Sequence, residues 1–98
     1  MSPASPAEDI LRRRVFIAGR DVAFGELDRD DVRMRADELR AVTGWGPTAR
    51  VAPVARAWRE MLLAMERADV LQVRELDPAV VRELAPRMWV VAPGGGLL

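Results

Sequence analysis

Five residue types are missing from this 98-residue chain: lysine, histidine, cysteine, tyrosine and asparagine. Four of these are the usual proton donors and acceptors near neutral pH, so only aspartate and glutamate are left for acid–base chemistry. The hydroxyl nucleophiles are Ser2, Ser5, Thr43 and Thr48, and no histidine or lysine exists to activate them. We therefore expect a protein that is not an enzyme, with paired-carboxylate chemistry as the one catalytic alternative left open.

The same absences bear on metals, cofactors and location. Without cysteine or histidine the chain has no disulfide and lacks the preferred ligands of zinc. A calcium loop beginning at Asp28 would need glycine at its sixth position, where Arg33 stands, so this acidic segment is interpreted as a helix start. We predict no metal and no cofactor, and a cysteine-free chain fits the reducing cytoplasm. No run approaches the roughly 20 apolar residues of a membrane helix, so no membrane association is expected.

What is present is the composition of a folded domain. The chain is 50% hydrophobic and 31% charged, and its 15 arginines are balanced by 15 acidic residues. This balance differs from that of disordered chains, and zero net charge gives no overall attraction to nucleic acid. The length suits one domain. We assign residues 6–92 to it, with a flexible arm at 1–5 and a flexible glycine-rich tail at 93–98.

Hydrophobic periodicity and helix-capping residues predict a mainly α fold of three to four helices around a central αα-hairpin. Its core would be built on the two longest patterns, at residues 29–43 and 49–68, joined by the glycine-rich turn around Trp45. A short helix is predicted to begin at Asp77-Pro78 and to end before Pro86.

Two segments have a second interpretation or a weaker pattern. The first helix is predicted from Pro6 to about Ala18, but residues 15–24 also fit two short strands that turn at Gly19-Arg20-Asp21. Near the C-terminus, the β-branched runs at 70–73 and 88–91 predict a short two-stranded piece. Whether these two runs pair with each other is left open.

The helix at 49–68 has the strongest amphipathic pattern in the chain. Its apolar face is about 120° wide and larger than the face that residues 29–43 offer to cover it. An apolar surface with too little cover indicates an interface between copies of the chain. We therefore predict a non-catalytic protein-interaction or regulatory domain that forms a homodimer, using Trp45, Val51, Val54, Trp58, Met61, Leu62 and Met65.

The alternative function is a small DNA-binding regulator. Residues 40–59 contain arginines but no acid, and they span the end of one helix, a tight turn and the start of the next. This outline is also that of a helix-turn-helix DNA reader. Its contact residues would be Arg40, Thr48, Arg50, Arg56 and Arg59. Zero net charge argues against strong phosphate binding, so nucleic acid is the less favoured partner.

Overall fold

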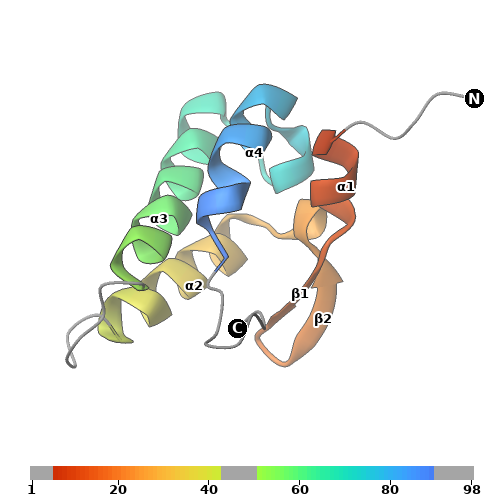
Figure 1. Ribbon diagram of the computed structural model, residues 1–98. Helices are drawn as coiled ribbons and strands as arrows, with labels where there is room; N and C mark the ends of the chain where they lie inside the picture. Colours follow the sequence, from red (N-terminus) through yellow and green to blue (C-terminus); the bar gives the residue numbers. More distant parts are fainter. Residues whose placement is uncertain (1–5, 43–50, 90–98) are drawn as a thin grey trace, which may run out of the picture.

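The computed structural model describes residues 6–42 and 51–89 and confirms a small, mainly α fold with a central αα-hairpin (Figure 1). The predicted arm at 1–5, the tail at 93–98 and Trp45 lie outside the described residues. In chain order the elements are α1 (Pro6–Arg12), β1 (Arg14–Ile17), β2 (Arg20–Ala23), the 3₁₀ turn η1 (Phe24–Glu26), α2 (Arg29–Val42), α3 (Val51–Ala68), η2 (Val73–Glu75), α4 (Pro78–Leu84) and η3 (Ala85–Arg87).

Residues 14–23 form an antiparallel β-hairpin, so the predicted helix up to Ala18 is wrong and the strand interpretation is correct. Burial alternates along β1, because Val15 and Ile17 are buried whereas Phe16 is 69% exposed. Alternation with a period of two belongs to a strand that is covered on one face. Four residues are too short a stretch for this period to stand out from a helical pattern.

The hairpin turns at Ala18-Gly19, earlier than the predicted Gly19-Arg20-Asp21 turn. Both turn residues have positive φ, 53° at Ala18 and 75° at Gly19. Two-residue hairpin loops need this left-handed backbone because its twist matches that of the strands. Alanine rarely adopts it, so the sequence provided no signal at Ala18.

The start of α2 is held by a reciprocal pair of aspartates. The carboxylate of Asp28 accepts a hydrogen bond from the backbone N–H of Asp31 at 2.8 Å, and the Asp31 carboxylate accepts one from the N–H of Asp28 at 3.3 Å. This arrangement confirms the predicted helix start. Asp31 is buried and also accepts a hydrogen bond from Arg20 at 2.6 Å, which ties the β-hairpin to α2.

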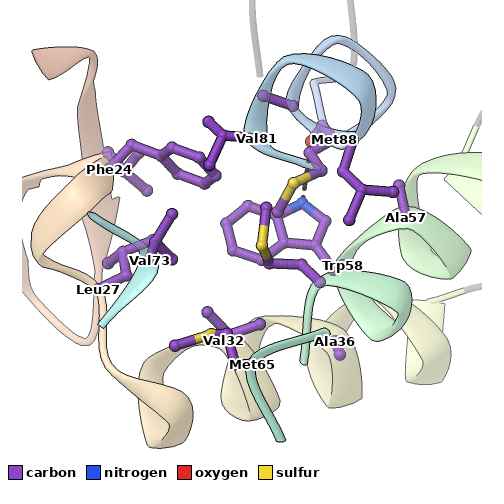
Figure 2. Packing of buried hydrophobic residues seen from close by; sticks show 14 of the residues in the cluster. Phe24, Leu27, Val32, Ala36, Ala57, Trp58, Met65, Val73, Val81 and Met88 are labelled. Carbon is purple, nitrogen blue, oxygen red and sulfur yellow. Dashed lines mark hydrogen bonds between the residues drawn. The ribbon is translucent and has the colours of Figure 1, made fainter. Parts of the chain in front are cut away.

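The core is centred on Trp58 of α3 (Figure 2). Its ring lies edge-on to Phe24 at 6.2 Å and to Trp89 at 6.4 Å, measured between ring centroids. The Trp58 indole N–H donates to the backbone carbonyl of Met88 at 2.9 Å, so its polar atom is satisfied. Around this centre α2, η2, α4 and η3 and the residues that directly follow η1 and η3 supply Val32, Val73, Val81, Leu84, Ala85, Leu27 and Met88.

The strand predicted at 70–73 is wrong. Only Gln72 pairs in β fashion, as an isolated bridge to Asp28, and Val73 begins the turn η2. The carboxylate of Glu75 accepts the N–H groups of Leu71 and Gln72 and so stabilises the turn. Of the predicted strand at 88–91, residues 88 and 89 are not in a strand and the other two lie outside the described residues. The sheet is at residues 14–23 instead.

The short helix predicted after residue 77 is confirmed as α4. Asp77 precedes it and accepts the N–H of Ala79 at 2.8 Å, and the helix ends at Leu84, before Pro86. Figure 1 shows α4 beside α3, on the side of α3 that faces α1. This position places α3 between α2 and α4, and each neighbour leaves a groove on the surface.

Candidate functional site

The apolar face predicted for self-association is mostly the interior of the chain itself. Val54, Trp58, Met61 and Met65 are at most 6% exposed. They cannot form a surface while the chain is folded, so their assignment to a dimer interface is wrong. Val51 and Leu62 are half-buried.

The prediction failed because the cover for α3 comes from segments distant in sequence. Val73 and Met88 lie in segments whose hydrophobic residues have no regular spacing, and Phe24 directly follows β2. None of the three therefore belongs to an apolar helix face that could be recognised in the sequence. All three reach the core beside Trp58 in the folded chain (Figure 2). The apparent excess of apolar surface on α3 is therefore largely used within the chain.

A groove with arginines on both walls lies between α2 and α3. Its volume is about 420 Å³. The floor is apolar, and the rim has four arginines and a single acid, Asp37, which is a local excess of three positive charges in a chain of net charge zero. We call it the basic groove, and it is lined by Arg33, Ala36, Asp37, Arg40, Ala52, Ala55, Arg56, Arg59 and Leu62.

The basic groove brings together three of the five predicted DNA contacts, Arg40, Arg56 and Arg59. The other two, Thr48 and Arg50, lie outside the described residues. Arg56 and Arg59 form no ion pair with any residue that the structure describes. Their guanidinium groups are therefore available to a partner.

The sequence interpretation missed Arg33 as a member of this groove. Arg33 forms an ion pair with Asp30 at 3.1 Å, and both side chains are largely exposed. The signal was nevertheless present, because Arg33 and Arg40 are seven residues apart and so lie on one face of α2. Arg33 lies outside the acid-free window at 40–59, because Asp30, Asp31 and Asp37 are close to it in sequence.

A second groove lies between α3 and α4, with a volume of about 530 Å³. Leu63 stands in it at 41% exposure, one of the most exposed large apolar side chains in the described chain. Two arginines and two glutamates surround it, so its formal charges cancel. We call it the mixed-charge groove, and it is lined by Glu60, Leu63, Ala64, Arg67, Val80, Glu83, Leu84 and Arg87.

Only half of the charges in the mixed-charge groove form an ion pair with a residue that the structure describes. Arg87 forms an ion pair with Glu60 at 3.4 Å. In contrast, Arg67 and Glu83 have no ion pair among residues 6–42 and 51–89. The groove therefore presents one unpaired cation and one unpaired anion beside an exposed leucine.

A third hollow, beside the start of α2, contains Asp28, Asp30 and Glu75. The carboxylates of Asp28 and Glu75 already accept hydrogen bonds from backbone N–H groups. Across the described ranges no three acidic side chains come together as a metal site, and every buried side-chain nitrogen or oxygen has a hydrogen-bond partner. This hollow therefore carries no catalytic or metal-binding assignment.

The described residues form a small mainly α domain with a groove on each of two sides of α3. None of its described helices is both long and apolar enough to span a bilayer. Comparison of the chain with protein-family models, with curated proteins and with solved structures gives no match.

Proposed function

We propose that this chain is a non-catalytic protein-interaction domain that self-associates as a dimer through α3. The contact surface is the mixed-charge groove, in place of the apolar face predicted from the sequence. The observation that carries the proposal is that Arg67 and Glu83, opposite charges without an ion pair among the described residues, line the same groove as the exposed Leu63. A surface with this composition is complementary to itself.

A twofold axis through such a groove satisfies both charges at once. In a symmetric dimer the same patch meets itself, so each contact between unlike residues is made twice. Arg67 of each copy would face Glu83 of the other, and the two Leu63 side chains would meet near the axis. The basic groove is unsuited to this role because two copies would bring arginine against arginine.

The non-catalytic part of the proposal rests on the residue inventory. The chain has no cysteine, histidine, lysine or tyrosine, and neither α3 groove contains a serine or threonine. A chain without cysteine also suits the reducing cytoplasm, which is where we propose that it acts.

Light scattering at micromolar concentration tests the self-association. We expect a mass of twice the 10.9 kDa of the chain. Leu63→Glu should give the monomer mass, because it places two carboxylates at the centre of the interface. A wild-type mass of 10.9 kDa at this concentration would remove the dimer from the proposal.

Charge reversal tests whether Arg67 and Glu83 make the contact. Arg67→Glu and Glu83→Arg should each weaken the dimer at least tenfold, and the double variant should restore it because unlike charges again face each other. Glu66→Arg is the matched control, since Glu66 is exposed on α3 and lies outside the groove. A double variant as weak as the single ones would contradict the proposed pairing.

The second candidate function is DNA binding, and the clustering of Arg40, Arg56 and Arg59 in one groove favours it. It ranks lower because Asp37 lies in the same groove and the floor is apolar, whereas a DNA backbone presents only phosphates and sugars. Titration of duplex DNA at two salt concentrations tests it. Binding that falls steeply with salt would support this candidate, and no binding at low salt would remove it.

A further inference from the structure

The basic groove is a second binding surface that the dimer proposal leaves unused. It shares no lining residue with the mixed-charge groove, although both lie along α3. An α3-mediated dimer would therefore leave its arginines accessible. A ligand of this groove must be complementary both to its apolar floor and to its positively charged rim.

The floor of the basic groove calls for an apolar ligand surface. Ala36, Ala52 and Ala55 line it, with Leu62 half-buried toward one end. Alanine side chains are short, so a segment lying in the groove can bring its backbone close to α2 and α3. A hydrated ion or an isolated phosphate would leave this apolar surface without a contact.

The arginines on the rim of the basic groove favour a ligand with negative charge along both of its edges. Arg33 and Arg40 stand on the α2 wall, about 10 Å apart along the helix axis at 1.5 Å per residue. Arg56 and Arg59 stand on the α3 wall and have no ion pair among the described residues. A matching segment therefore has an apolar stripe with acidic residues along both edges.

Asp37 adds a finer requirement. It is the single acid of the groove and lies on α2 between Arg33 and Arg40. A uniformly anionic ligand, such as a nucleic-acid backbone, would meet repulsion there. A polypeptide can place a neutral or basic side chain opposite Asp37 and acids on either side.

We propose that the basic groove binds an acidic amphipathic helical segment of another protein. The segment lies with its apolar stripe on the floor, and its carboxylates pair with the arginines of the two walls. This is the helix-in-groove mode of recognition. It is independent of the dimer, so a monomeric Leu63→Glu chain should keep this activity.

Fluorescence anisotropy with a labelled peptide tests the proposal on the full chain. The probe is a designed helix of about 18 residues whose leucine stripe is flanked by glutamates, a length sufficient for appreciable helicity. We expect saturable binding that weakens at least tenfold in Arg59→Glu and again in Arg56→Glu. Arg82→Glu is the matched control, because Arg82 is exposed on α4 and lies in neither α3 groove.

Two further variants separate groove binding from simple charge attraction. Ala55→Leu fills the floor without altering charge, so it should weaken binding while circular dichroism shows the helical content retained. A peptide of the same composition in scrambled order should bind at least tenfold more weakly, because it has no apolar stripe.

Three outcomes would overturn the proposal. One is the absence of saturable peptide binding, and another is equal binding of the scrambled peptide. The third is tighter binding of duplex DNA with a steep salt dependence, which would make the groove a nucleic-acid surface. The Leu63→Glu chain keeps this test separate from the dimer, since loss of dimerisation leaves the basic groove intact.

Discussion

The inner and outer faces of α3 differ in residue type and in what covers them. On the inner face Trp58 and Met61 are at most 1% exposed and packed among aromatic and aliphatic side chains. On the outer faces Leu63 is 41% exposed, and Arg56 and Arg59 of the basic groove are exposed as well. One helix therefore serves both folding and, in our proposals, binding. Substitutions on the inner face should lower stability, and those on the outer faces should lower binding.

The largest expected effect is at the centre of the inner face. Trp58→Ala removes a fully buried ring and leaves the Met88 carbonyl without its hydrogen bond. Such truncations cost about 3–5 kcal/mol, a large share of the stability of a small domain. Urea denaturation monitored by circular dichroism measures the loss. A cost below about 1 kcal/mol would contradict the central position of Trp58.

On α2, too, a buried side chain should contribute more to the free energy of unfolding than an exposed one, although the difference is smaller than on α3. Asp31 is buried and its carboxylate accepts hydrogen bonds from Arg20 and from the N–H of Asp28. We expect Asp31→Ala to cost about 2 kcal/mol, since hydrogen bonds to charged groups are worth about 1.5–3 kcal/mol each and Arg20 is half-exposed.

Asp30 provides the matched control on the open side of α2. Its ion pair with Arg33 is solvent-exposed, so Asp30→Ala should cost less than about 0.5 kcal/mol. Both variants are compared in one urea titration series. If the two substitutions lowered the free energy of unfolding equally, burial would not distinguish these faces of α2.

The smallest expected change in stability is at Leu63. Leu63→Ala removes an exposed side chain and leaves no cavity, so the free energy of unfolding should change by less than about 0.5 kcal/mol. The dimer should nevertheless weaken, because Leu63 is its proposed centre. Thermal unfolding of the monomer at low concentration and light scattering at high concentration separate the two effects. A large loss of monomer stability would place Leu63 in the core after all.

Sequence reasoning succeeded where a structural signal is local. The start of α2 at Asp28 and the start of α4 at Asp77 were predicted because a capping side chain bonds N–H groups two or three residues away. It failed at Ala18, because the turn needs a left-handed backbone there and alanine is not a residue type that indicates one. It also failed at Val73, whose β-branched neighbourhood favours a strand but whose anchoring in the core produces a 3₁₀ turn.

The candidate surfaces were predicted only in part, for a related reason. Arg40, Arg56 and Arg59 were found because they are close in sequence and free of intervening acid. Arg33 and Leu63 were missed. Whether a residue lines a groove depends on its own helix and also on which helix packs beside it.

The residue inventory and the helical periods follow from the sequence alone, and with them the mainly α class and the absence of lysine, histidine, cysteine and tyrosine. Tertiary structure alone decided what covers the apolar side of α3, because Phe24, Val73, Val81 and Met88 reach Trp58 from segments far apart in the chain. Capping and periodicity act within a few residues and can be recognised from local spacing. Burial depends on contacts between distant segments, and these exist only when the whole chain has folded.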